Sequence, residues 1–108
     1  MEEIIVLVTA GSEVEATSIA RALVEKKLVA CVNILPGVRS IFQWEGKVTE
    51  EYEYLLVVKT VNQAFEHVVE AVKSLHSYRV PEIIALSIQQ GLPEYLHWVR
   101  EATRQASQ

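Results

Sequence analysis

The chain has 108 residues, of which 50% are hydrophobic and 22% are charged, and this is enough for one globular domain with its own core. Its formal net charge is −4 and its ten Lys and Arg residues are scattered, which argues against a nucleic-acid-binding surface or a basic membrane-binding face. All fourteen acidic residues are Glu, which excludes metal-binding loops built on Asp. The single Cys forms no internal disulfide and the opening residues lack a signal-peptide pattern, so we expect a cytoplasmic protein.

The first segments predict a strand followed by a helix. Residues 4 to 9 form a short β-branched run, which is typical of a strand in the middle of a sheet. Ser12 followed by Glu15 matches the capping-box pattern and predicts the start of a helix. The helix is expected to fade near residues 27 and 28, and its apolar stripe consists of Ala16, Ile19, Ala20 and Leu23.

Residues 30–44 and 47–60 predict two paired strands that are much longer than the usual 3–10 residues. The second strand of the chain should begin at about Val29, and Pro36 and Gly37 predict a bulge within it. Glu45 and Gly46 are typical of a two-residue hairpin turn. A ribbon of this length must extend beyond the core, and its far end carries side chains that need cover, namely Val38, Ile41, Phe42, Trp44, Val48, Tyr52 and Tyr54.

The remaining chain predicts an amphipathic helix at 65–75, a loop at 76–81, a strand from Glu82 to Gln89 and a closing helix that begins near Pro93. The element order is βαββαβ plus one helix. With right-handed crossovers this predicts a ferredoxin-like α+β sandwich, in which both long helices cover one face of a four-stranded antiparallel sheet. We expect one domain over residues 1–108, with a long ribbon made of the second and third strands.

Such a sheet has helices on one side only, so its other face and its open edges need cover from further copies of the chain. Closed rotational symmetry provides that cover, and we favour a homotrimer, although the spacing alone requires only that the protein is not a monomer. The aromatic residues predicted at the interface are Trp44, Phe42, Tyr52 and Tyr54.

Five spaced blocks of sequence resemble the CutA family of divalent-cation tolerance proteins. They are ACVNILPG at 30–37, SIFQWEGK at 40–47, LVVKT at 56–60, HSYRVPEI at 76–83 and YLHW at 95–98, and the match runs in register from about Ile4 to Ala102. The resemblance implies a ferredoxin-like fold, a tight homotrimer, no established enzymatic activity and a role in tolerance of copper and other divalent metals. We therefore expect that the protein requires no cofactor.

The resemblance also suggests candidate metal ligands. Copper-associated members of the family carry a thiol in the first strand and paired histidines before the loop, and the matching positions here are Val8 and Leu75–His76. His76 is therefore predicted to bind copper or another divalent metal weakly, and the alternative is that it only caps the preceding helix. Cys31 is a second candidate ligand, and the alternative is a small buried hydrophobic residue.

Polar residues on the ribbon support a second functional hypothesis, a PII-like signalling or small-ligand-sensing trimer. The predicted inter-subunit cleft consists of Lys59, Glu53, Asn33, Tyr78 and Glu82. Cross-strand charge pairing that fixes the register is the alternative for Lys59, Glu53 and Asn33. His67 and His97 are predicted to be solvated on outer helix faces. An enzyme that uses interface carboxylates is the third hypothesis, and no nucleophile–base pattern favours it.

Overall fold

The computed structural model describes residues 2–104, so residue 1 and residues 105–108, at the two ends of the predicted 1–108 domain, lie outside it. The strands are β1 (Glu3–Ala10), β2 (Cys31–Trp44), β3 (Lys47–Val61) and β4 (Ile83–Ser87). The helices are α1 (Glu13–Glu25), α2 (Phe65–Leu75) and α3 (Pro93–Ala102), and a short 3-10 turn, η1 (Asn62–Ala64), precedes α2.

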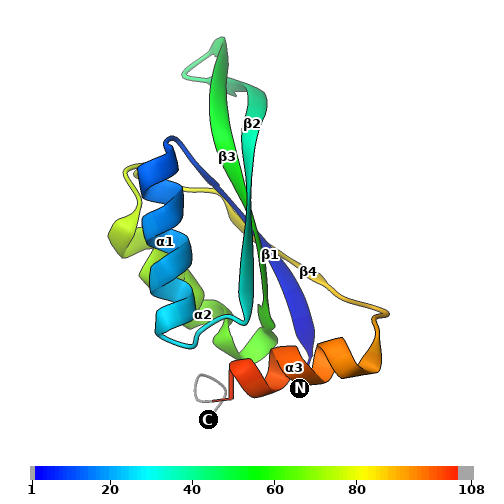
Figure 1. The fold of residues 1–108 in the computed structure, drawn as a ribbon. Helices are drawn as coiled ribbons and strands as arrows, with labels where there is room; N and C mark the ends of the chain where they lie inside the picture. Colours follow the sequence, from blue (N-terminus) through cyan, green and yellow to red (C-terminus); the bar gives the residue numbers. More distant parts are fainter. Residues whose placement is uncertain (1, 105–108) are drawn as a thin grey trace.

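The four strands form one antiparallel sheet in the order β2-β3-β1-β4. Helices α1 and α2 lie together on one face of the sheet, and α3 crosses its lower end next to the start of β1 (Figure 1). This arrangement confirms the predicted ferredoxin-like α+β sandwich with a long ribbon and an extra C-terminal helix.

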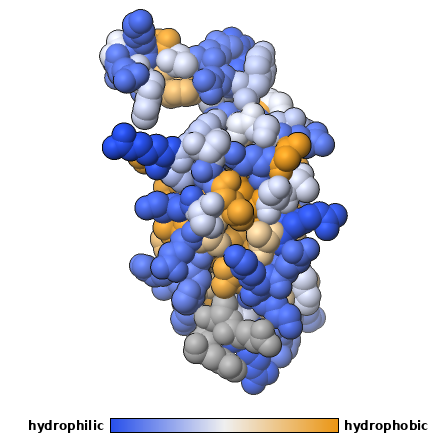
Figure 2. All heavy atoms as spheres, turned by 90° about the vertical axis from the view of Figure 1, so that its left-hand side faces the viewer, coloured by the Kyte–Doolittle hydropathy of each residue, from blue (hydrophilic) through white to orange (hydrophobic). Residues whose placement is uncertain are grey.

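The main core lies between the sheet and helices α1 and α2. Every second residue of β1 from Ile4 to Ala10 is buried, because side chains alternate between the two faces of a strand. These side chains pack with fully buried residues of the helices, such as Ile19, Leu23 and Val72. Figure 2 shows the outer side of the helix layer, where hydrophilic side chains dominate and hydrophobic ones form a narrow central band.

The ribbon of β2 and β3 projects from this body (Figure 1). Strand β1 pairs with β3 only between Tyr54 and Val61, so residues 47–53 have β2 as their one strand partner among the described residues. At about 3.4 Å per residue the projecting part is about 20 Å long, and the molecule measures 44 × 27 × 21 Å. The predicted turn is confirmed, because Glu45 and Gly46 both have positive φ (51° and 77°).

The sheet face opposite α1 and α2 is only partly covered. Ile84 and Leu86 of β4 are 51% and 53% exposed there, and Leu35 of β2 is 43% exposed. Side chains alternate between the two faces along a strand. The cross-strand partners of all three residues are separated from Lys59, or from the residue opposite Lys59 on β1, by zero, two or four positions, so all three side chains lie on the same face as Lys59. This open face is the surface that the sequence predicted to need cover.

Three local predictions need correction. Strand β4 is shorter than predicted and spans Ile83–Ser87, although the backbone N–H of Ile88 still donates to Glu3 O. Strand β2 begins at Cys31 rather than at about Val29, although the backbone N–H of Ala30 already donates to Lys59 O. The capping box is half formed, since Ser12 Oγ accepts from the Glu15 N–H but the Glu15 carboxylate is engaged elsewhere. The predicted bulge is confirmed by a register shift between Leu35 and Val38.

Candidate functional site

Polar side chains gather at two places in the fold. The first, which we call the loop cluster, consists of Glu15, Glu53, His76, Ser77 and Tyr78 and lies where the loop after α2 meets the base of the ribbon. The second, the sheet-face cluster, consists of Cys31, Asn33 and Lys59 on the open face.

His76 is the centre of the loop cluster, and its side chain is fully buried. The backbone N–H of Tyr78 donates to His76 Nδ1 at 3.0 Å, so Nδ1 is the acceptor and Nε2 carries the ring proton. Nε2 then donates to the carbonyl oxygen of Thr9 at 2.6 Å. Both ring nitrogens are therefore used to hold the loop against the end of β1.

Glu15 connects helix α1 to the same loop. Its Oε2 accepts the backbone N–H of Ser77 at 3.1 Å, and its Oε1 lies 3.5 Å from His76 Nδ1. Oε1 is buried and accepts no hydrogen bond from the described residues. This role of Glu15 could not be predicted from its local sequence, because Glu15 stands at the capping-box position and nothing near it points to a loop 62 residues away.

Tyr78 fastens the loop to the ribbon. Its hydroxyl donates to Glu53 Oε2 at 2.8 Å, and Glu53 is buried. Burial raises the pKa of the Tyr78 hydroxyl above its ordinary value, and the hydrogen bond to Glu53 and the charge of that carboxylate raise it further. Gly11 leaves room for the ring, since a Cβ at this position would lie 3.0 Å from the Tyr78 hydroxyl oxygen.

The sheet-face cluster lies at the opposite end of the sheet. Cys31 pairs directly with Lys59 across β2 and β3, and the Lys59 ammonium contacts Asn33 Oδ1. The Cys31 sulfur lies 4.0 Å from the same oxygen. Next to it, Tyr95 and Trp98 of α3 form a tilted ring pair with centroids 5.5 Å apart. Burial, followed by the neighbouring Cys31, raises the pKa of the Tyr95 hydroxyl.

Within one chain the predicted cleft residues divide between the two clusters. Lys59 and Asn33 are together, and Tyr78 and Glu53 are together, but Lys59 and Glu53 are about 20 Å apart along β3 at about 3.4 Å per residue. Glu82 is exposed just before β4. A cleft that contains all five residues therefore requires more than one chain.

The two predicted metal ligands are also far apart. His76 bonds to Thr9, which is level with Leu55 on β3, whereas Cys31 is level with Lys59, about 14 Å further along the strand. No group of three or more His, Cys or Glu side chains within residues 2–104 is arranged to hold a metal ion. His67 and His97 are exposed, as predicted.

The predicted interface aromatics occupy different surroundings. Phe42 and Trp44 lie on one face of the projecting ribbon and Tyr52 lies on the other, and each of the three is exposed. Tyr54 differs from them, because it pairs with Ala10 at the base of the ribbon and packs against the main core. No helix in the part of the chain described here is both long enough and apolar enough to span a membrane.

Comparisons with known proteins agree with this fold. The family model of the CutA1 divalent ion tolerance protein matches residues 4–102. The chain is 56% identical over 103 residues to the divalent-cation tolerance protein CutA of Thermus thermophilus, which covers 95% of this chain and 99% of that protein. Protein CutA of Mus musculus is 47% identical over 100 residues, covering 93% of this chain and 56% of the mouse protein.

Solved structures show the same similarity. The structure of the divalent cation tolerance protein Cut A1 from Thermus thermophilus superposes with a TM-score of 0.92 at 55% identity, over 94% of this chain and 98% of that one. The periplasmic divalent cation tolerance protein CutA from Archaeoglobus fulgidus superposes with a TM-score of 0.91 at 44% identity, over 94% and 98% of the two chains. The chain therefore belongs to the CutA1 divalent ion tolerance protein family.

Proposed function

We propose that the chain works as a cytoplasmic homotrimer in divalent-cation tolerance and that it catalyses no reaction. The tolerance role follows from the family to which the chain belongs. The observation that supports self-assembly is the projecting half of the ribbon, because both of its faces carry exposed apolar side chains. One face carries Phe42 and Trp44, and the other carries Ile41, Val48 and Tyr52. An apolar ribbon that stands free in water favours association with other chains.

The two apolar faces favour three copies over two. A neighbour that packs on one face of the ribbon leaves the other face in water. In a closed ring each ribbon can lie between two neighbours, and three is the smallest number of copies for which these neighbours are different molecules. The same ring can turn the open sheet faces toward its axis.

Native mass spectrometry over a wide dilution series tests the assembly. We expect a species with three times the 12.2 kDa mass of the chain to persist as the protein is diluted. A soluble single-chain species at micromolar concentration would contradict the proposal, and a stable dimer would contradict its stoichiometry.

The geometry supports no more than weak metal binding. Copper at His76 must replace the hydrogen bond to Thr9 or the one from Tyr78, and the ring is fully buried. Within residues 2–104 no group of three or more His, Cys or Glu ligands is arranged around Cys31 or His76, so the donor set does not fit a resident metal. We therefore propose weak copper or other divalent-metal binding at His76, and a tolerance role that does not depend on a bound cofactor.

Calorimetric titration of Cu(II) tests the metal proposal. Weak binding to the wild type that decreases in the His76→Ala variant supports it, with the exposed His67→Ala and His97→Ala variants as controls for loose surface uptake. Binding that is lost only when His67 or His97 is replaced removes His76 from the proposal.

The absence of catalysis is supported by the same cluster. His76 has no free ring nitrogen for proton transfer to a substrate, and the adjacent Glu15 and Glu53 carboxylates are mostly buried against the loop. A general base must reach the proton that it removes, and within residues 2–104 no group of the loop cluster is accessible enough to do so.

Lys59 favours a second candidate function, a PII-like small-ligand-sensing trimer. Lys59 is half-buried and its side chain lies on the open sheet face, which assembly would bring into contact with another copy. A thermal-shift screen against small metabolites separates the two functions. Stabilisation by an organic anion that is lost in Lys59→Ala favours sensing over metal binding.

A further inference from the structure

Two rows of side chains across the open face of the sheet are aliphatic except at one corner. Residues that lie opposite one another form rows across the four strands. The first row is Cys31, Lys59, Ile5 and Leu86, and the second is Asn33, Val57, Leu7 and Ile84. The polar members of both rows are adjacent to one another at the β2 edge. Polar groups within an apolar surface need hydrogen-bonding or charged partners, so this corner differs from the rest of the two rows in the ligands that it can bind.

Lys59 provides an unpaired positive charge in this corner. Its ammonium has three N–H donors, and the contact with Asn33 Oδ1 uses one of them. No carboxylate within residues 2–104 forms an ion pair with Lys59. The Asn33 carbonyl therefore positions the ammonium but does not neutralise it, and two donors remain for an anionic acceptor.

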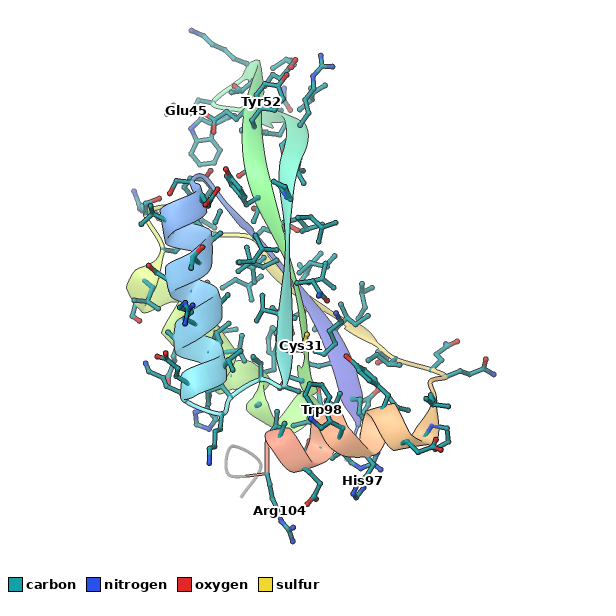
Figure 3. All side chains as sticks on the ribbon, in the orientation of Figure 1. Cys31, Glu45, Tyr52, His97, Trp98 and Arg104 are labelled. Atoms are coloured by element: carbon teal, nitrogen blue, oxygen red, sulfur yellow. The ribbon has the colours of Figure 1, made fainter. Side chains whose placement is uncertain are left out.

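Helix α3 adds an aromatic wall beside the cation. Its residues Tyr95 and Trp98 are 40% and 46% exposed and lie against each other as a ring pair. Trp98 and Cys31 are at the same end of the sheet (Figure 3). The Tyr95 hydroxyl is protonated at neutral pH, since the ordinary tyrosine pKa is about 10 and burial and the nearby Cys31 raise it further. Aromatic rings of this kind pack against planar or apolar ligand bodies.

The geometry points to a binding site for a small carboxylate with an apolar or aromatic body, held by Lys59 and Asn33 at its charged end and by Tyr95 and Trp98 along its body. This inference rests on the second proposed function and changes its site. It adds the two aromatic residues of α3 and leaves out Glu53, Tyr78 and Glu82. Cation and amide donors recognise the carboxylate, and the rings exclude water from the rest of the ligand.

Isothermal titration calorimetry with benzoate as the probe, on the full chain at constant ionic strength, tests the site. We expect wild type to bind benzoate but not benzyl alcohol, which has the same ring without the charge. The Lys59→Met variant should bind benzoate at least about tenfold more weakly, because a charge-assisted hydrogen bond is lost. The Lys59→Arg variant should retain binding, and the exposed Lys47→Met variant is the matched control.

A second variant separates the aromatic wall from the cation. Trp98→Ala should weaken benzoate binding but leave acetate binding unchanged, and it remains informative if Lys59→Met does not fold. Equal benzoate binding by wild type and Lys59→Met, or no binding by wild type, overturns the inference. Native mass spectrometry of the same samples reports the assembly independently, so a failed site and a failed trimer are distinguishable.

Discussion

The Tyr78 hydroxyl donates a 2.8 Å hydrogen bond to Glu53 Oε2 and so ties the loop after α2 to the base of the projecting ribbon. The two residues are 25 positions apart, and Glu53 lies at the point where β3 loses β1 as a partner. The ring of Tyr78 also packs on His76, with centroids 4.6 Å apart. These contacts place the loop cluster where it can set the direction in which the ribbon leaves the body.

Removing the hydroxyl should therefore destabilise the fold. In Tyr78→Phe the buried Glu53 carboxylate loses its donor, and we expect the free energy of unfolding to fall by about 1–3 kcal/mol. Denaturant unfolding at fixed protein concentration measures the change, because assembly makes apparent stability depend on concentration. Tyr52→Phe is the matched control, since Tyr52 lies next to Glu53 on β3 and is 70% exposed in a single chain. An equal loss in both variants would contradict a role for the Glu53 bond.

Alkaline pH should weaken the same contact. The pKa of Tyr78 is raised in the folded state by burial and by Glu53, so the folded state retains the proton to higher pH than the unfolded state. The contribution of Tyr78 is complete below the ordinary tyrosine pKa of about 10 and decreases as the pH rises above it. Tyr95 is shifted in the same direction, so Tyr78→Phe should reduce the decrease without abolishing it. Unfolding measured from about pH 9 to about pH 11 compares the two slopes.

Two substitutions of Glu15 should have different effects on the free energy of unfolding. Glu15→Ala removes the acceptor for the Ser77 N–H and should lower the free energy of unfolding by about 1–3 kcal/mol. Glu15→Gln keeps an acceptor for the Ser77 N–H and removes the negative charge from a buried group whose Oε1 accepts no hydrogen bond within residues 2–104. We expect Glu15→Gln to be no less stable than wild type at neutral pH. Glu13→Gln, on the exposed side of the same helical turn, controls for the loss of charge. A Glu15→Gln variant as unstable as Glu15→Ala would show that the charge itself is required.

Local sequence signals account for the parts of the fold that were predicted. The Glu45–Gly46 turn, the bulge after Leu35 and the Ser12 cap each depend on residues a few positions apart, and the structure contains all three. The β-branched run at residues 4 to 9 likewise predicted a strand in the middle of the sheet, and β1 lies between β3 and β4. Such features follow from backbone and side-chain geometry without knowledge of the tertiary structure.

The loop cluster could not be predicted in the same way. Glu15 meets Ser77 and Tyr78 meets Glu53 only after the sheet and helices have packed, and both pairs are distant in the sequence. The capping-box pattern predicts that the Glu15 carboxylate bonds to the start of its own helix. In the structure the carboxylate accepts the Ser77 N–H of the loop instead. Strand alternation placed Lys59 and Asn33 near each other, and the two side chains are in contact. The position of Tyr95 on α3 beside Cys31 could not be predicted from local sequence, because it depends on how the C-terminal helix packs.

The ribbon offers a test of assembly with a closely matched control. Val48 and Val14 are 80% and 78% exposed in one chain, but Val48 lies on the projecting ribbon and Val14 lies on the outer side of α1. If the ribbon is covered by neighbouring copies, Val48→Lys must bury an ammonium and should weaken association at least about tenfold, whereas Val14→Lys should leave association unchanged. In a free chain the new ammonium lies in water, because Val48 is exposed there, so the isolated fold should tolerate the substitution. Light scattering over a dilution series compares the two variants, and equal association in both would mean that the ribbon face remains in water.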